Sequence, residues 1–145
     1  MLACDIVVAS EQAELGLPEP RLGFPPGAGG PQHLIRQIPS KHAMGMLLTG
    51  RRITATDALK FGLVNEVVPY SELETAAKKW ANEVLHCAPL GVQAAKQMAL
   101  DGAHLPYNEA ISRSYYMNDA VKKSLDYLEG PRAFVEKRKP TWTGM

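Results

Sequence analysis

One glutamate, Glu19, stands in the part of this sequence that is richest in glycine and proline. Pro18 stiffens the backbone just before this carboxylate, and the stretch at residues 27–30 contains three glycines. Glycine lets the main chain approach a ligand closely, and free N–H groups can stabilise negative charge that develops on a carbonyl oxygen. A fixed carboxylate beside such groups suits proton transfer next to a carbonyl. Glu19 is therefore the first catalytic candidate, although most glutamates are simply surface residues.

The glycine-rich stretch fits neither of the common nucleotide-binding motifs. A P-loop requires a lysine after its glycines, and none follows this stretch. A dinucleotide fingerprint requires a strand directly before its glycines, whereas Pro25 and Pro26 precede this stretch. The four histidines lack metal-ligand spacing, and there is no Gly-x-Ser-x-Gly elbow, so neither a metal site nor a serine hydrolase is expected. Helix N-terminal N–H groups that face a substrate or a water molecule explain the stretch better.

Composition narrows the class of protein. The 145 residues are 46% hydrophobic, which is enough for one domain with a core, and the net charge of +1 indicates no surface for nucleic acid or an anionic membrane. No apolar run is long enough to span a bilayer, and Asp5 interrupts the N-terminal one, so no signal peptide is expected. Cys4 and Cys87 are expected to be buried, reduced thiols. We therefore expect a soluble, cytoplasmic protein.

The first half of the chain alternates strands and helices. Residues 5–9 and 63–68 have the composition of buried strands, and residues 13–16 form an extended segment that enters the glycine loop. Because the chain begins directly in strand-like sequence, we expect a further segment upstream of it. Three helices are expected, which start at Pro31, at a Ser40 cap and at a Thr54 cap and end before Pro39, Gly50 and Gly62.

From residue 70 onward the pattern predicts helices alone. Ser71 and Glu74 have the spacing of a capping box in front of an apolar helical stripe. The basic run at residues 136–139 is either a solvated helix end or a contact for a phosphate-bearing ligand. Further helices are expected from Pro89 to about Gly102, as one long helix after Pro106, and as a basic turn at residues 132–139 beyond a break at Gly130 and Pro131.

The chain resembles the enoyl-CoA hydratase/isomerase (crotonase) family along nearly its whole length. Each matching segment is modest evidence by itself, but together they occur in the family's order and spacing. The segments are Ala-Cys-Asp-Ile at residues 3–6, Gly-Leu-Pro-Glu at 16–19, Pro-Gly-Ala-Gly-Gly at 26–30, Thr-Gly-Arg-Arg-Ile at 49–53, Gly-Leu-Val-Asn at 62–65, Val-Val-Pro at 67–69 and Ala-Phe-x-Glu-Lys-Arg at 133–138.

The resemblance implies an α/β fold in two parts. Residues 1–69 would be the C-terminal part of a crotonase-like ββα spiral, and residues 70–145 an α-helical trimerisation and lid region. It also implies a homotrimer, commonly paired into a homohexamer, with an acyl-CoA substrate and no cofactor, because coenzyme A is part of the substrate. The implied activity is that of a lyase of fatty acid metabolism, which adds or removes water across the double bond of an enoyl-CoA thioester.

In the family's hydratases two glutamates hold a water molecule between them. The resemblance assigns one of these roles to Glu19, a contact with the attacking water to the N–H of Gly27, and contacts with coenzyme A to Phe134 and Lys137. The second glutamate, in a Gly-Gly-Gly-x-Glu segment, and the oxyanion-hole N–H groups would lie upstream of Met1. The chain as given is therefore expected to be incomplete as an enzyme.

Departures from the family pattern leave three interpretations open. Gly27 stands where several isomerase and specialised dehydratase branches carry aspartate, and glycine at this position, as in typical hydratases, favours water chemistry over isomerisation. Pro-Gln-His at residues 31–33 replaces the usual Thr-Gln-Arg and is expected to change the edge of the pocket, while the Arg51–Arg52 pair resembles carnitinyl-CoA dehydratase-like members. The interpretations are a hydratase, an enoyl-CoA isomerase or carnitinyl-CoA dehydratase-like enzyme, and an inactive, truncated oligomerisation subunit.

Overall fold

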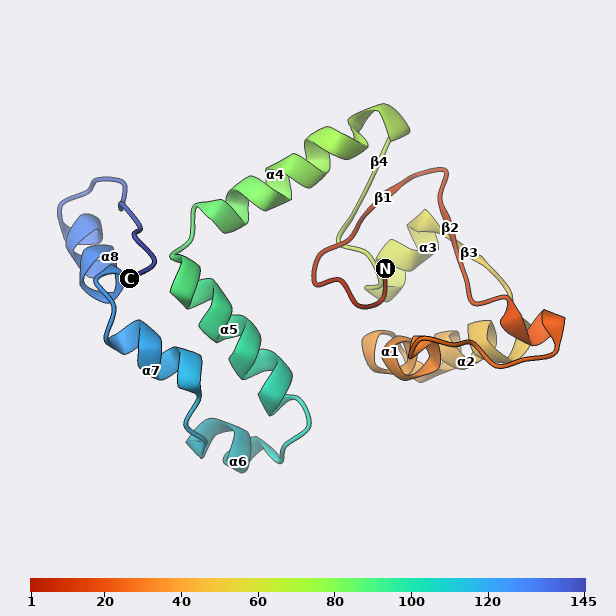
Figure 1. The fold of residues 1–145 in the computed structure, drawn as a ribbon. Coiled ribbons are helices and arrows are strands. Elements are labelled where there is room, and N and C mark those ends of the chain that lie inside the picture. The colour runs from red at the N-terminus through yellow and green to blue at the C-terminus, as the bar shows by residue number, and fades with distance from the viewer. The chain divides into compact units, whose positions relative to one another are not determined.

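The computed structural model describes residues 1–145, which form two compact units, residues 1–80 and residues 81–145 (Figure 1). All of the strands lie in the first unit, and the second unit is helical. The boundary that the sequence predicts at residues 69–70 follows the last strand, whereas the compact units divide within helix α4 (Leu73–Leu85). The chain belongs to the mixed α/β class that the sequence predicts.

Two small sheets organise the first unit. One is a parallel pair and the other is antiparallel, and the residues between the two parallel strands supply the long connection that such a pair needs. The side chain of Asn65 accepts a hydrogen bond from the N–H of Val7 at 2.8 Å and extends the parallel pairing. The strands are β1 (Val8–Ser10) with β4 (Glu66–Val68), and β2 (Glu14–Leu15) with β3 (Ile53–Thr54).

The parallel strands are shorter than predicted. Leu63 and Val64 are buried, but they lie in the turn after helix α3 (Ala55–Phe61) rather than in a strand. The N–H of Leu63 donates to the carbonyl of Ala58 at 2.8 Å and so closes the end of that helix. The apolar residues at 63–64 were therefore correctly predicted to be buried but wrongly predicted to be in a strand. Apolar residues are buried both in a paired strand and in the turn that ends a packed helix, so the pattern does not separate the two.

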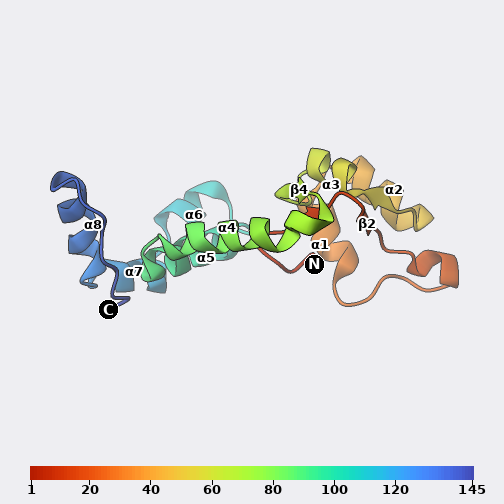
Figure 2. The ribbon, with the colours of Figure 1, turned by 90° about the horizontal axis from the view of Figure 1, so that it is seen from above.

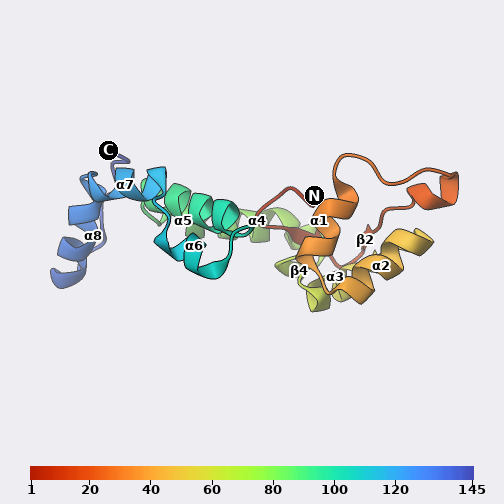
Figure 3. The same ribbon diagram turned by 90° about the horizontal axis from the view of Figure 1, so that it is seen from below.

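The first unit also contains three complete α-helices, the first part of α4 and two short 3-10 helices, the first of which is η1 (Glu19–Leu22). Helices α1 (Gly30–Gln37) and α2 (Ser40–Thr49) lie side by side (Figure 3). Their inner faces meet the sheets in a small core, whose most deeply buried members are Leu34, Ala43, Met46, Ala55 and Ala58.

Two of the predicted helix caps have different outcomes. The hydroxyl of Thr54 accepts a hydrogen bond from the N–H of Asp57 at 3.1 Å, so Thr54 caps α3 as predicted. Ser40 does not cap α2, because Pro39 takes the N-cap position and no side chain bonds to the first turn. The capping box at Ser71 is also absent, since this serine lies inside a 3-10 turn, η2 (Tyr70–Glu72), that leads into α4.

In the second unit α5 (Pro89–Gly102) packs against both α6 (Tyr107–Ser112) and α7 (Tyr116–Lys122) (Figure 2). The predicted long helix after Pro106 is wrong: the chain is extended at residues 113–115 and continues as α7 and then α8 (Asp126–Val135). The interruption buries Tyr115, which is only 5% exposed and donates its hydroxyl to the carbonyl of Ala110 at 2.7 Å.

The predicted helix break at Gly130 and Pro131 is also wrong, because both residues lie inside α8. Pro131 removes one N–H from the helix, but contacts from the C-terminal tail hold this segment. The ring of Trp142 packs against Gly130, where an added Cβ would lie 3.3 Å from Cη2. The indole N–H of Trp142 donates to the carbonyl of His86 at 2.8 Å.

Two simpler expectations can be compared with the structure directly. Cys4 and Cys87 are free, as predicted, but both are exposed, so the prediction of burial is wrong. Cys4 lies in the loop before β1, and Cys87 follows α4 with its thiol 3.4 Å from the carbonyl oxygen of Glu83. No helix has the length and apolar character needed to cross a membrane.

Candidate active site

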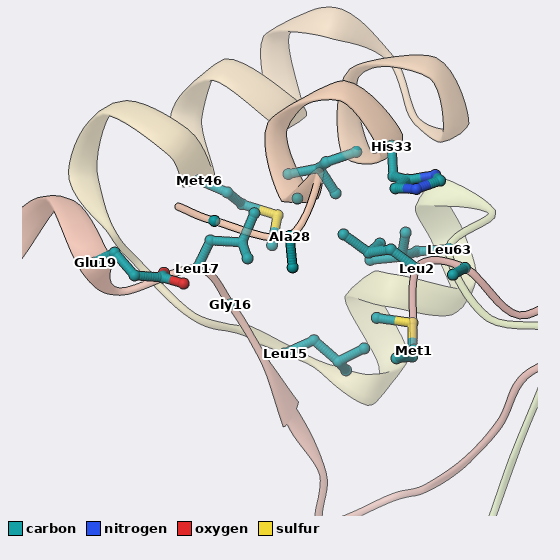
Figure 4. Close-up of a pocket in the computed structure, with 14 residues that line it drawn as sticks. Met1, Leu2, Leu15, Gly16, Leu17, Glu19, Ala28, His33, Met46 and Leu63 are labelled. Carbon is teal, nitrogen blue, oxygen red and sulfur yellow. The ribbon is translucent and has the colours of Figure 1, made fainter. Parts of the chain in front are cut away.

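Glu19 is the first residue of η1, directly after Pro18. Its atom Oε2 is buried and has no hydrogen-bond partner, the one buried side-chain polar atom of which this is true. Figure 4 shows the carboxylate directed from η1 toward the cavity wall at Leu17. A buried carboxylate oxygen without a donor is unfavourable, so this atom is set up to accept a hydrogen bond from a molecule in the cavity.

The cavity beside Glu19 has a volume of about 450 Å³, which is within the range of small-molecule sites. Glu19 and Gly27, the two residues predicted to be catalytic, both line it. Most of the wall is apolar, and its larger side chains include those of Leu15, Leu17, Leu34, Met46 and Leu63 (Figure 4). An apolar cavity with one buried carboxylate can hold an apolar group and place a proton donor or acceptor beside a water molecule or an activated carbon next to it.

The loop at residues 27–30 bends sharply at the rim of the cavity. Ala28 and Gly29 both have left-handed backbone conformations, with φ values of +50° and +75°. The N–H of Gly30 donates to the carbonyl of Gly27 at 2.9 Å, and α1 starts there. A left-handed conformation is strained for alanine, and such strain is common in loops that hold a functional geometry. The loop therefore has a defined backbone geometry where it lines the cavity.

His33 is the second polar side chain on the cavity wall. It lies on the first turns of α1, and in Figure 4 it stands at the opposite end of the cavity from Glu19. The predicted change at the pocket edge therefore falls on a lining residue. The apolar wall residues escaped prediction as site residues, because their apolar periodicity is that of any buried helix or strand.

Phe134 and Lys137, predicted to contact coenzyme A, lie in the second unit at the end of α8. Phe134 is 85% exposed, which is unusual for so large an apolar side chain. Lys137 is also exposed, and its φ of +53° places it in the left-handed region. The structure brings these two residues onto one turn of the chain.

Acidic and arginine side chains surround this turn. Arg138 forms two hydrogen bonds with Glu129, at 2.6 and 2.9 Å, and a third with Glu136 at 2.6 Å. Hydrogen bonding from Arg138 is the main cause that lowers the pKa of Glu129 to about 2, and it also lowers the pKa of Glu136. Both carboxylates therefore stay ionised under ordinary conditions. Spacing alone did not predict this cluster, because Arg138 reaches Glu129 only where the chain turns back at the end of α8.

Asp126 holds the C-terminal tail against α8. This carboxylate is 5% exposed and accepts hydrogen bonds from the N–H and hydroxyl of Thr143, at 2.8 and 2.9 Å, and from the N–H of Gly144 at 2.9 Å. The backbone N–H of Thr143 is the main cause that lowers the pKa of Asp126. Glu129 adds a further bond, since it accepts from the N–H of Thr141 at 2.8 Å.

Comparison with known proteins gives consistent results. A model of the enoyl-CoA hydratase/isomerase family matches residues 1–145. The chain is 43% identical over 141 residues to a probable mitochondrial enoyl-CoA hydratase of Dictyostelium discoideum, and this match covers 97% of the chain and 51% of that relative. It is 39% identical over 150 residues to a carnitinyl-CoA dehydratase of Salmonella paratyphi A, with 99% and 56% covered.

A solved structure shows the same fold. The crystal structure of an enoyl-CoA hydratase from Bacillus anthracis matches with a TM-score of 0.94 and 39% identity, and the match covers 99% of this chain and 56% of that one. The chain thus spans about half the length of the curated relatives that it matches. The crotonase-like fold that the sequence resemblance implied is confirmed.

Proposed function

Because the chain belongs to the enoyl-CoA hydratase/isomerase family, we propose that it supplies Glu19 as a proton-transfer group for adding water to, or removing it from, an enoyl-CoA thioester. The observation that carries this proposal is the buried, unpaired Oε2 atom of Glu19 at a cavity that Gly27 also lines. A water molecule bound there would supply the hydrogen-bond donor that this atom lacks.

The proposed chemistry is reversible. Hydration forms a C–O bond at C3 and a C–H bond at C2 of the enoyl group, and dehydration breaks both. Glu19 would handle one of the two protons, and a second acid–base group of the complete active site would handle the other. Paired groups of this kind need different protonation states, so that one donates while the other accepts.

The cavity wall supports an acyl group as the part of the substrate bound beside Glu19. Leu17, Leu34 and Met46 offer apolar contacts and no fixed hydrogen-bond donors, which suits a hydrocarbon chain better than a sugar or a nucleotide. The Gly27 position supports hydration over isomerisation, as the sequence predicts. A dehydratase acting on a carnitinyl-type thioester is the second candidate, and the observation in its favour is the 39% identity to a carnitinyl-CoA dehydratase.

The experiment that tests the proposal is the substitution Glu19→Gln in an active form of the protein. Glutamine keeps the shape of the side chain but cannot accept the proton, so we expect hydration of crotonyl-CoA to fall by roughly 10²-fold or more. Glu14→Gln is the matched control, because Glu14 only pairs with Arg52 on the surface, at 3.3 Å. Near-normal turnover in a folded Glu19→Gln variant would contradict the proposal.

At the other end of the substrate, we propose that Phe134 and Lys137 contact coenzyme A. An exposed aromatic ring can stack on adenine, and a lysine can pair with phosphate through charge-assisted hydrogen bonds. This contact would give the basic run at residues 136–139 a binding role rather than that of a solvated helix end.

We also propose that helices α6 to α8 mediate assembly into homotrimers or homohexamers. Several large apolar side chains on these helices are more than half exposed, and surfaces of that kind are typical of subunit interfaces. They include Tyr107, Ile111, Tyr116 and Leu128. Light scattering of the purified protein tests the proposal, and a monomer at micromolar concentration would contradict it.

The cytoplasm is the proposed location. The support is chemical: Cys4 and Cys87 are exposed and free, and exposed thiols stay reduced in that compartment. Fractionation of cells that express a tagged form of the protein tests this proposal, and recovery of the protein in an organelle fraction would contradict it.

A further inference from the structure

The chain ends α8 with a Schellman motif in which Lys137 occupies the position where glycine is usual. The N–H of Arg138 donates to the carbonyl of Ala133 at 3.1 Å, and the N–H of Lys137 donates to the carbonyl of Phe134 at 3.2 Å. This pair of bonds requires a left-handed residue, and Lys137 has a φ of +53°. Glycine adopts this conformation without steric strain and lysine does not, so the backbone at Lys137 is strained where glycine would not be.

The side chain after Lys137 replaces the usual support of such a motif. A Schellman motif normally packs an apolar residue at this position against the helix. Here Arg138 takes that position and forms its two hydrogen bonds with Glu129 and the third with Glu136. Because Glu129 lies on α8 and is only partly exposed, the arginine fixes the backbone on the C-terminal side of Lys137.

The carboxylates of this network bind arginine side chains and leave the ammonium group of Lys137 without a carboxylate partner. Glu129 and Glu136 are both occupied by arginines, since Arg132 also pairs with Glu136, at 2.9 Å. No carboxylate pairs with Lys137, so its ammonium group is available to an anion. The exposed ring of Phe134 lies on the same turn.

We propose that Glu129, Arg138 and Glu136 are positioning residues, which hold Lys137 in its left-handed conformation so that it meets a phosphate group of coenzyme A beside Phe134. This inference rests on the proposed acyl-CoA function. It assigns the network a role in substrate affinity in addition to fold stability. The arginine and the two glutamates themselves do not touch the ligand.

Two substitutions separate strain from binding. Lys137→Gly removes both the strain and the charge, so we expect a higher melting temperature and a dissociation constant for coenzyme A that rises roughly tenfold or more. Lys137→Ala keeps the strain and removes the charge, so we expect the same loss of affinity without a rise in melting temperature. The binding measurement is isothermal titration calorimetry with coenzyme A, with pantetheine as the probe that lacks the nucleotide phosphates.

Glu129→Gln tests the positioning role. It breaks the paired contact with Arg138 without touching the ligand, so we expect the dissociation constant for coenzyme A to rise roughly threefold or more, with pantetheine binding unchanged. Glu74→Gln is the matched control, because it removes a surface ion pair with Lys78 on α4. If Glu129→Gln fails to fold, as judged by circular dichroism, Arg138→Lys keeps the charge and removes the two-pronged geometry.

The outcomes distinguish this inference from the proposed function. Wild-type affinity in Glu129→Gln and Arg138→Lys, together with weaker binding in Lys137→Ala, would overturn the positioning role alone. Unchanged affinity in Lys137→Ala would overturn the phosphate contact, even where Glu19→Gln abolishes hydration. Loss of coenzyme A and pantetheine binding to the same extent would also contradict the inference, because it would indicate a general structural effect.

Discussion

Glu19 owes its candidacy to local and tertiary features together. Pro18 restricts the backbone before it, and η1 starts at the glutamate itself. The apolar residues that line the cavity beside it come from β2, α1, α2 and the turn after α3. A carboxylate with the same sequence neighbours on an open loop would be hydrogen-bonded by bulk water and would not bind one water molecule in a fixed position. At the scale of single residues, chemistry therefore depends on which groups the fold leaves without partners.

Helix caps give a second residue-scale contrast. Thr54→Ala removes the bond to the N–H of Asp57, so we expect the free energy of unfolding to fall by about 1 kcal/mol. Ser40→Ala is its matched control, because no side chain caps α2 and the expected change is close to zero. Urea denaturation followed by circular dichroism measures both. Equal losses of stability in the two variants would contradict the capping assignment.

At the scale of elements, α8 and the C-terminal tail depend on each other. Alone, the sequence of α8 contains a glycine and a proline that favour a break. In the fold, Asp126 and Glu129 bind the tail and Trp142 covers Gly130, so the helix continues. The C-terminal tail thus stabilises α8, a helix that its glycine and proline would otherwise interrupt.

The tail contact is expected to release in acid. Asp126 and Glu129 both have lowered pKa values in the fold, that of Glu129 falling from 4.5 to about 2. A lowered pKa means that the folded state favours the ionised form, so this stabilisation is complete above about pH 4.5 and is lost as the pH falls toward 2. The indole N–H signal of Trp142 in NMR spectra should therefore shift in that window.

Asp126→Asn supplies the comparison for this prediction. The amide cannot carry the charge that the Thr143 and Gly144 N–H groups stabilise, so we expect the Trp142 signal of this variant to resemble the acid form at neutral pH. Asp57→Asn, which affects only a surface ion pair with Lys60, should leave the signal in its wild-type position. An Asp126→Asn spectrum identical to wild type would show that the carboxylate does not hold the tail.

At the scale of the whole molecule, the 145-residue chain by itself is expected to hydrate crotonyl-CoA poorly. Glu19 is the only carboxylate on its cavity wall, whereas the proposed reaction uses two acid–base groups. A general acid–base group typically contributes about 10²–10⁴ in rate, so a cavity wall with one such carboxylate is expected to catalyse this reaction poorly. We also expect self-association through the exposed apolar residues of α6 to α8. Efficient hydration by a monomer, measured by an absorbance assay and light scattering, would contradict this expectation.

The sequence by itself determined the class, the family resemblance and the candidates Glu19 and Gly27. It could do so because these features are local. A proline and glycines restrict the loop around Glu19, and Thr54 and Gly62 mark the two ends of α3. The order of the motifs also predicted the crotonase-like fold, which the comparison with solved structures confirms. The roles of Phe134 and Lys137 stay predictions, although their placement on one turn is consistent with them.

Only the tertiary structure decided which local tendencies prevail. Burial of Tyr115 splits the long helix, tail contacts carry α8 through Pro131, and Arg138 holds Lys137 in a conformation that its own side chain disfavours. In each case hydrogen bonds or apolar contacts formed in the folded chain outweigh a backbone preference of about 1–3 kcal/mol. The buried, unpaired oxygen of Glu19 also belongs to the tertiary structure, since the cavity beside it is lined by Leu34 and Met46 of α1 and α2 as well as by its sequence neighbour Leu17.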